Sequence, residues 1–254
     1  MSNPAQLSIW NLLLSSIADE MGIALWRTGH SPNIRERKDF SCALFDIEGG
    51  LVAQAAHIPV HLGAMPEAIK VISRLAPWDE GDIVILNDPY LGGTHLPDIA
   101  LIMPIFENEM PIAFSAAMTH HQDVGGMTPG SVPTNATEIF QEGIRIPPLK
   151  YYSRGEVNST LVKILRLNVR LPDSFEGDLN AQVAACHIGR RRLISLSEKY
   201  GAENIKYIFA ELLDRSEVMT RNAIKELPNG IFSHSDYLDN DLSLIHISAP
   251  TRLG

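Results

Sequence analysis

Hydrophobic residues recur at helical spacing near the beginning of the chain. One apolar stripe is formed by Leu7, Trp10, Leu14, Ile17, Met21 and Leu25. A spacing of three or four residues is typical of an amphipathic helix. Asn3 is a residue type that caps helices, and Pro4 suits the first helical position. The sequence therefore predicts a helix from Pro4, followed over residues 27–37 by a charged loop.

The pattern then changes to short apolar runs separated by turn residues, which predict β-strands. The predicted strands are residues 40–46, 51–56, 82–86, 99–106 and 111–118. The first two strands flank a glycine-containing turn and the last two flank a polar turn, so each pair predicts a hairpin. Between the hairpins, residues 63–75 predict a helix.

The second half of the chain has helical character. Residues 121–150 are rich in Gly, Pro, Thr and Ser and predict a long ordered loop, which inside a compact domain is usually functional. After it we expect a short helix at residues 160–167, a longer helix that Asp178 caps and Gly201 ends, and a third helix over residues 202–226. The pattern indicates the α+β class, with a β-rich N-terminal half that carries the site followed by a helical segment.

The end of the chain differs in character from the rest. We expect residues 1–241 to form a single domain whose last strand begins near Ile231. Residues 242–254 resemble the translation of a sequencing adapter, so we interpret them as a non-native tail and expect the natural protein to continue past Asp241.

Composition narrows the class of protein. The 254 residues are 45% hydrophobic and 20% charged, which is enough apolar material for a sizeable core. The net charge of -9 argues against a nucleic-acid partner, and we interpret the basic run at residues 190–192 as a solvated or subunit-facing patch. Cys42 and Cys186 lie too far apart in sequence to indicate a disulfide framework or a cysteine-based zinc site. With no signal peptide and no apolar run long enough to span a membrane, we expect a cytoplasmic protein.

Histidines provide the main indication of chemistry, because six of the nine lie between His30 and His121. Two segments, His95-Leu96-Pro97-Asp98 and His120-His121-Gln122-Asp123, each place a histidine three residues before an aspartate at a glycine-marked turn. Neutral imidazole and carboxylate are good ligands for zinc, manganese or iron. Two such turns at neighbouring strand ends predict a divalent metal site, although either motif alone is also compatible with local capping.

Two further segments add candidates of lower specificity. The charged run at residues 33–39 is typical of a solvated face, yet Glu36 lies between arginines that would keep it ionised if it pointed inward. His57 and His61 lie in a loop before a predicted helix and are typical of satisfied structural histidines. The sequence contains neither a nucleophile elbow nor a phosphate-binding loop, so ATP, if it is used, would bind to another chain.

At this point the motifs resemble a known family. They are Asn33-Ile34-Arg35-Glu36-Arg37 with Asp39-Phe40-Ser41-Cys42-Ala43, His57-Ile58-Pro59-Val60-His61-Leu62-Gly63, Asn87-Asp88-Pro89-Tyr90, Gly93-Thr94-His95-Leu96-Pro97-Asp98 and His120-His121-Gln122-Asp123-Val124-Gly125-Gly126. Taken together and in this order, they resemble the hydantoinase B/5-oxoprolinase family, which includes N-methylhydantoinase subunits and is related to subunits of acetone carboxylase.

The resemblance implies a fold, a partner and a site. It implies a hydantoinase B-like fold and a hetero-oligomer with a hydantoinase A-type subunit, which binds ATP and phosphorylates the substrate carbonyl oxygen. The divalent metal ion is manganese in the acetone carboxylase branch, but manganese, zinc and iron all remain open here. The implied metal ligands are Glu36, His95, Asp98 and His120, and His121 is the alternative to His120. Asp123 and the histidine that is not a ligand are the implied catalytic bases.

The expected function is therefore metal-dependent, ATP-dependent hydrolysis of a cyclic amide of the hydantoin or 5-oxoproline type. In this mechanism the metal would lower the pKa of water, and phosphorylation would make the lactam carbon electrophilic. A subunit of an ATP-dependent ketone carboxylase is an alternative that the motif residues do not separate from this one. A non-catalytic scaffold subunit is a third interpretation.

Overall fold

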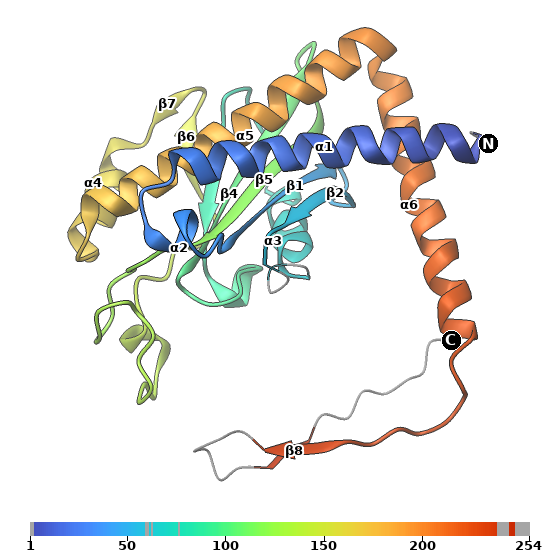
Figure 1. Ribbon diagram of the computed structural model, residues 1–254. Helices are drawn as coiled ribbons and strands as arrows, with labels where there is room; N and C mark the ends of the chain where they lie inside the picture. Colours follow the sequence, from blue (N-terminus) through green and yellow to red (C-terminus); the bar gives the residue numbers. More distant parts are fainter. Residues whose placement is uncertain (1–2, 59–60, 62, 76, 238–243, 247–254) are drawn as a thin grey trace. The chain divides into compact units, whose positions relative to one another are not determined.

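The protein is described by a computed structural model over residues 3–58, 61, 63–75, 77–237 and 244–246. It forms two compact units, residues 1–213 and 214–254. In the first unit the described strands form a seven-stranded antiparallel sheet with the order β2-β1-β5-β4-β3-β6-β7 (Figure 1). The strands are β1 Phe40–Asp46, β2 Leu51–Ala56, β3 Ile83–Leu86, β4 Asp98–Glu107, β5 Met110–His120, β6 Leu149–Ser153 and β7 Glu156–Val157.

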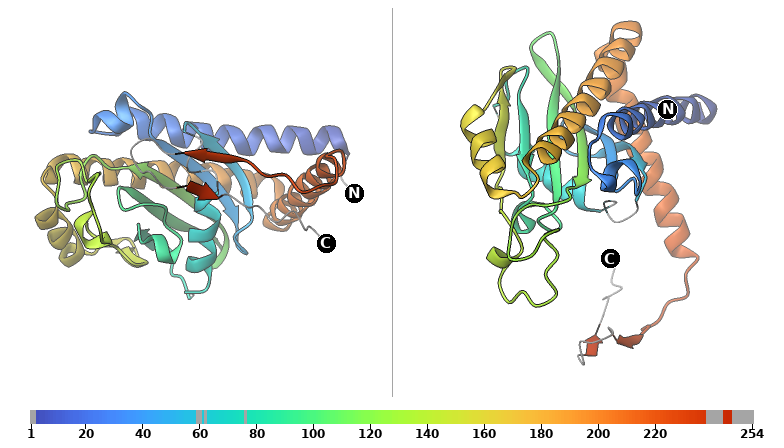
Figure 2. Two further views of the ribbon diagram at one scale, coloured as in Figure 1. Left: turned by 90° about the horizontal axis from the view of Figure 1, so that it is seen from below. Right: turned by 60° about the vertical axis from the view of Figure 1, so that its left-hand side comes forward.

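Helices cover both faces of this sheet (Figure 2). The long helices α1 (Pro4–Thr28) and α5 (Pro172–Tyr200) pack on one face, and α3 (Ala64–Ser73) packs on the other. The remaining helices are α2 Pro32–Arg35, α4 Ser159–Asn168, α6 Ala202–Lys225 and the short 3-10 turns η2 Pro89–Leu91 and η3 Ile139–Gln141. The fold is therefore α+β, as predicted.

The first helix confirms the apolar pattern of the sequence. The Asn3 side chain accepts a hydrogen bond from the backbone N of Ala5 at 3.0 Å, and Pro4 begins the helix. The buried residues of α1 include the whole predicted stripe, Leu7, Trp10, Leu14, Ile17, Met21 and Leu25. This stripe joins the core between the sheet and α5, which explains why a 25-residue helix forms here.

Alternation along β4 and β5 divides the interior into two cores. Ile99 and Leu101 face α1 and α5, whereas Ala100 and Ile102 face α3. Successive residues of a strand point to opposite faces, so the fully apolar run of β4 fills both cores at once. An irregularity between Ile105 and Phe106 shifts the β4–β5 register by one residue.

Two features differ from the sequence prediction. Ser31 caps the single turn α2 within the segment expected to be a loop, where Pro32 supplies the first helical residue. Asp178 lies inside α5 instead of capping it, because α5 begins earlier, at Pro172. The buried Asp178 carboxylate accepts hydrogen bonds from the backbone N of His30 at 2.7 Å and of Ser31 at 3.0 Å, so it fixes the entry into α2.

The pair β6–β7 was not predicted from the sequence. These strands follow the long loop predicted at residues 121–150 and extend the sheet beyond β3. Their outer position explains the missing signal, because alternation is weak where β6 is only partly buried and β7 is exposed. None of the helices within the described residues is both long and apolar enough to cross a membrane.

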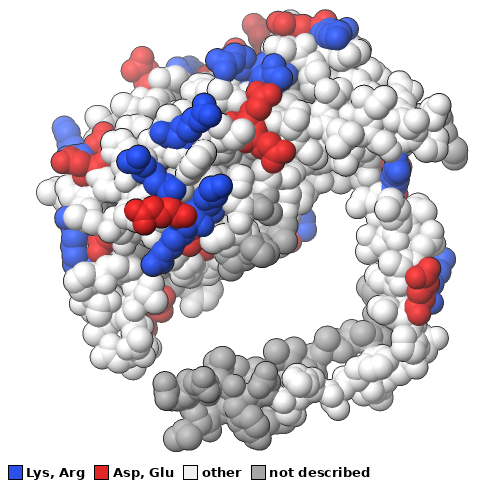
Figure 3. All heavy atoms as spheres, viewed as in Figure 1, with Lys and Arg blue, Asp and Glu red and all other residues white. Residues whose placement is uncertain are grey.

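The basic run at residues 190–192 lies on α5, where its side chains meet acidic neighbours. Arg190 forms an ion pair with Glu80, and Arg192 forms one with Glu20 at 3.0 Å. Figure 3 shows basic and acidic side chains interspersed on this face of the molecule. The run therefore does not form a continuous positive surface of the kind that binds phosphates.

In the second unit, α6 continues from Asp214 and is followed by a two-stranded antiparallel sheet of β8 (Ser235–Tyr237) and β9 (Leu244–His246). Strand β8 lies in the segment where a strand was expected near Ile231. Apart from β9, the segment interpreted as a non-native tail lies outside the described residues.

Gly189 marks a close approach of α5 to its neighbours. A Cβ at this position would lie 2.4 Å from Ser115 Oγ and 2.7 Å from Met21 Sδ. We expect Gly189→Val to destabilise the protein by about 1–3 kcal/mol, because the added carbons would overpack the core. Urea unfolding measures this change in the free energy of unfolding. Ser195→Val on the exposed face of the same helix should stay within about 0.5 kcal/mol of wild type. Equal stability of the two variants would contradict the close packing.

Candidate metal centre

The ends of three adjacent strands, β1, β5 and β4, lie side by side at one end of the sheet, on the face covered by α3. Asp98, at the beginning of β4, pairs with His120 at the end of β5. The backbone N of His120 donates to the carbonyl of Asp39, the residue before β1, at 3.0 Å. Opposite residues of antiparallel strands point to the same face. Asp39, His120 and Asp98 therefore form a row across three adjacent strands.

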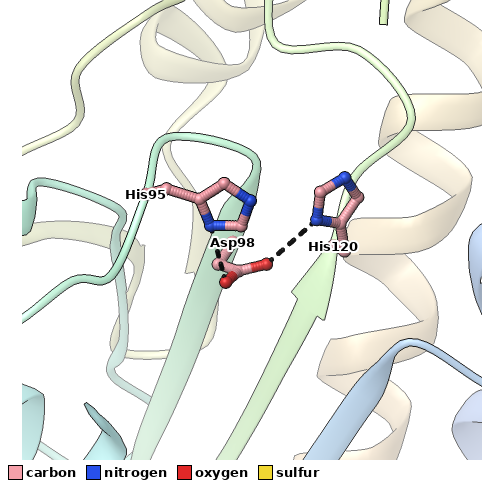
Figure 4. A group of neighbouring side chains, drawn as sticks. All are labelled: His95, Asp98 and His120. Carbon is pink, nitrogen blue, oxygen red and sulfur yellow. Dashed lines mark ion pairs between the residues drawn. The ribbon is translucent and has the colours of Figure 1, made fainter. Parts of the chain in front are cut away.

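Asp98 is the centre of a cluster of side chains (Figure 4). Its Oδ2 lies 2.8 Å from His95 Nδ1 and accepts a hydrogen bond from Thr94 Oγ1 at 2.7 Å. Its Oδ1 lies 3.3 Å from His120 Nδ1. Among the described residues, His95, Asp98 and His120 are the group whose ligand atoms all lie within 4.8 Å of one another.

His61 approaches the same carboxylate from another side. Its Nε2 lies 3.5 Å from Asp98 Oδ1 and 4.0 Å from Asp39 Oδ1. The Ser41 hydroxyl lies 3.0 Å from Nδ1 of the same ring, and this contact orients Nε2 toward Asp98. His61 is fully buried, so this third carboxylate–imidazole contact of Asp98 is shielded from solvent.

The electrostatics of the cluster centre on the buried Asp98 carboxylate. Burial alone would raise the pKa of Asp98, but the imidazoles of His120, His61 and His95 hold that pKa well below its usual range. The hydrogen bond with Asp98 raises the pKa of His95. The carboxylate is therefore ionised and surrounded by nitrogen atoms that compete for a cation or a proton.

The cluster fits a divalent metal ion. Asp98 Oδ1 and His61 Nε2 are both buried without a hydrogen bond of acceptable geometry, although they face each other. Leaving such groups unsatisfied costs free energy. Imidazole nitrogen and carboxylate oxygen are ligands for zinc, manganese and iron, and a cation at this point would satisfy the unpaired Oδ1 of Asp98.

The predicted ligands His95, Asp98 and His120 lie together, whereas Glu36 does not join them. Glu36 ends α2 with an exposed side chain. The α2 turn displaces the chain so that Asp39, three residues later, enters the row at the strand ends. Asp39 is therefore the acidic residue of this segment that the structure places beside the cluster.

His121, predicted as a catalytic residue or alternative ligand, lies on the α5 side of the sheet. Its Nε2 is 3.0 Å from Gln182 Oε1, and its ring packs on Phe175 with a centroid distance of 4.8 Å. Neighbouring residues at the end of a strand point to opposite faces, which explains why His120 and His121 separate. Burial lowers the pKa of His121 and favours the neutral ring. The geometry therefore favours His120 as the ligand and a packing role for His121.

Asp123, the other predicted catalytic residue, holds the long loop in place. Its Oδ1 accepts hydrogen bonds from the backbone N of Gly125 and of Arg170, both at 3.0 Å. Its Oδ2 accepts from Gly130 N at 3.2 Å and from Arg170 Nη1 at 2.9 Å. Burial would raise the pKa of Asp123, but these hydrogen bonds lower it. A carboxylate with both oxygens occupied in this way is poorly suited to accept a proton from water.

The sequence did not single out Asp39 as a candidate, and it predicted that His61 is a structural histidine. Asp39 directly precedes β1, and Ser41, two residues later, contacts His61. Residues two apart in a strand point to the same face, so this spacing could have indicated that Asp39 faces the same side as Ser41. His57, from the same segment as His61, packs its ring on Phe40. The two histidines of that segment thus have different environments, which their spacing alone did not reveal.

The fold and this geometry can be compared with known proteins. The family model described as Hydantoinase B/oxoprolinase matches residues 3–252. This chain belongs to the hydantoinase B/oxoprolinase family. It is similar to the B-type subunit of a putative D-/L-hydantoinase from a Pseudomonas species, with 37% identity over 90% of this chain and 40% of the relative. The chain thus spans about two fifths of the length of that curated relative.

Two solved structures share the fold. The ATP-dependent caprolactamase from Pseudomonas jessenii superposes with a TM-score of 0.88 at 32% identity, over 94% of this chain and 42% of the caprolactamase chain. Nucleotide-free acetone carboxylase superposes with a TM-score of 0.82 at 22% identity, over 92% of this chain and 31% of that chain. At that identity, the likeness to acetone carboxylase shows the fold alone.

Removing one imidazole should abolish metal retention. We expect the wild-type protein to retain a divalent metal ion after purification and His95→Ala to lose it while keeping its fold, because the half-exposed ring would contribute a ligand atom and makes little packing. Elemental analysis and circular dichroism measure the two properties. His187→Ala, which removes an exposed histidine of α5, is the matched control and should keep the metal. Unchanged metal content in His95→Ala would count against this site.

Metal binding should weaken in acid. Ligand imidazoles must be neutral, and Asp98 raises the pKa of His95 above 6.5, so protons compete already at mildly acidic pH. We expect affinity for Mn²⁺ or Zn²⁺, measured by calorimetry, to be full at alkaline pH and to fall as the pH drops through this raised pKa.

In the metal-free protein, the stability of the fold depends on pH in the opposite direction. The protonated His95 stabilises the fold below pH 6.5, and this contribution is lost as the pH rises through the raised pKa. A pH-independent affinity would exclude histidine ligands.

Proposed function

We propose that this chain is the metal-holding part of a hydantoinase B-type subunit, which hydrolyses a cyclic amide in an ATP-dependent complex. The observation that carries the proposal is the buried Asp98 carboxylate, which lies between the imidazoles of His95, His120 and His61. Family membership supports the same reaction class, since the family description includes hydantoinase and oxoprolinase.

The proposed ligands are His95, Asp98 and His120, with Asp39 in the place that the family resemblance assigned to Glu36. These side chains come from the ends of β4 and β5 and the start of β1, so the sheet fixes their spacing. A divalent ion held there would supply Lewis-acid polarisation of a carbonyl or phosphoryl oxygen and activation of water.

The protein residues around the ligands have separate tasks in this proposal. Thr94 donates to Asp98 Oδ2 and fixes the plane of the carboxylate. His61 is the proposed proton acceptor, because its Nε2 faces Asp98 and has no hydrogen bond. Ser41 holds the other nitrogen of that ring, so the proton-accepting atom is oriented before substrate arrives.

ATP chemistry is assigned to a partner chain. The sequence has no phosphate-binding loop, and two relatives, a hydantoinase and a caprolactamase, are named as single subunits of larger enzymes. We propose a hydantoinase A-type partner that binds ATP and phosphorylates the carbonyl oxygen of the amide. At the Asp98 cluster the activated carbon would then react with one water, which breaks the C–N bond and releases the amine, and with a second water, which releases the phosphoryl group as phosphate and leaves the carboxylate.

The decisive experiment joins this chain to its ATP-binding partner. We expect the purified complex to hydrolyse 5-oxoproline or a hydantoin with ATP, to lose this activity after chelation, and to regain it with Mn²⁺ or Zn²⁺. Product analysis by chromatography and phosphate release measure the reaction. The Asp39→Asn variant should lower activity and metal affinity, while Glu36→Gln should leave both unchanged.

Other outcomes would identify the alternatives. Carboxylation of acetone with bicarbonate, without amide hydrolysis, would assign the chain to a ketone carboxylase and contradict the proposal. Less than about a tenth of an equivalent of metal, together with full activity of the complex, would favour a scaffold role.

A further inference from the structure

The loop after β3 places a second functional group beside the Asp98 cluster. The β3–β4 register pairs Leu86 with Ala100. β3 ends at this pair, and Asp88 follows two residues later, where its side chain caps η2. The loop that begins at Asp88 therefore leaves β3 at the end of the sheet where β4 begins.

Asp88 is buried and forms an ion pair with Arg145. Its Oδ1 accepts a hydrogen bond from the backbone N of Tyr90 at 3.0 Å, and its Oδ2 lies 3.2 Å from Arg145 Nε. The rings of Tyr90 and Phe140 lie 5.9 Å and 6.0 Å from the Cζ of Arg145. The guanidinium is therefore positioned by a carboxylate and two aromatic rings.

The edge of Arg145 that carries Nη1 and Nη2 is free to bind a ligand. Within the described part of the chain, neither atom has a hydrogen-bond partner. Two parallel N–H groups in a fixed plane match the two oxygens of a carboxylate or phosphoryl group. Tyr90 and Phe140 are 75% and 72% exposed, so a ligand at the guanidinium could also contact their rings.

Arg145 is not needed to hold the loops together, because Asn87 does so. The Asn87 side-chain amide donates to the carbonyls of Leu96 at 2.7 Å and Ile144 at 2.9 Å. Its side-chain oxygen accepts from the backbone N of Ile146 at 2.6 Å. The segments that carry Arg145 and the Asp98 cluster are thus fixed to each other independently of the arginine.

We propose that Arg145 binds an oxyanion of the substrate processed at the Asp98 cluster. The inference rests on the proposed function, because it assigns the substrate a negatively charged group beside the reacting amide. That group is either a carboxylate of the substrate, as in 5-oxoproline, or the phosphoryl group added by the partner chain. Arg145 would hold it with Nη1 and Nη2 while the amide lies toward Asp98.

Calorimetric titration of the full chain with inorganic phosphate and with 5-oxoproline tests this assignment, each in the presence and absence of Mn²⁺. We expect Arg145→Gln to weaken binding of at least one probe by roughly ten- to a hundredfold, the usual loss for a charged hydrogen-bonded contact. Arg145→Lys, which keeps the charge and removes the fork, should give an intermediate loss. Affinity for Mn²⁺ should be unchanged in both variants, and circular dichroism verifies their folding.

Arg154→Gln is the matched control, because Arg154 is a surface arginine that also pairs with a single aspartate, Asp79. It should leave the affinity for both probes unchanged. Binding of phosphate alone would identify the phosphoryl group as the ligand, and binding of 5-oxoproline alone would identify the carboxylate.

The inference is overturned if wild type binds neither probe, if Arg145→Gln binds both as wild type does, or if Arg154→Gln shows the same loss. Its failure is distinguishable from failure of the proposed function. Loss of oxyanion binding in Arg145→Gln without any metal binding by wild type would contradict the metal centre and leave the Arg145 site standing.

Discussion

The register of the β4–β5 hairpin is the constraint on which the cluster depends. Asn108 and Glu109, at the turn, both have positive φ angles of 49° and 64°, as a tight hairpin turn requires. The irregularity after Ile105 then shifts the pairing by one residue. Without that shift Asp98 would lie opposite Thr119, whose side chain points to the α5 face. The bulge therefore brings Asp98 and His120 onto one face.

Placing an ionised carboxylate at that position has an energetic cost that the surrounding residues offset. A buried charge is costly unless it is paired and hydrogen-bonded. Asp98 is paired with His95 and His120 and receives the Thr94 hydroxyl, yet its Oδ1 keeps a lone pair without a hydrogen bond. Incomplete pairing of a buried carboxylate among imidazoles is the physical basis for assigning a cation to this point.

The same edge of the sheet gathers groups with different chemistry. Asp39, His120 and Asp98 follow one another across three strands, and Asp88, in the loop after β3, pairs with Arg145. Asn87 fixes the two loops that carry these groups. A cationic guanidinium near the proposed metal site would suit a substrate that has an anionic group beside the reacting bond, which is why the proposed function and the proposed role of Arg145 are linked.

The sequence by itself determined the helical stripe of α1, the two hairpins and a candidate site at His95 and Asp98 with His120 or His121, because periodicity and motif spacing are local properties of the chain. Only the tertiary structure decided that Asp39 and His61 approach Asp98, that Glu36 points to solvent, and that His121 and Asp123 are occupied by Gln182 and Arg170. These outcomes depend on strand register, on the α2 turn and on contacts between residues more than forty positions apart, and none of these is encoded in local spacing.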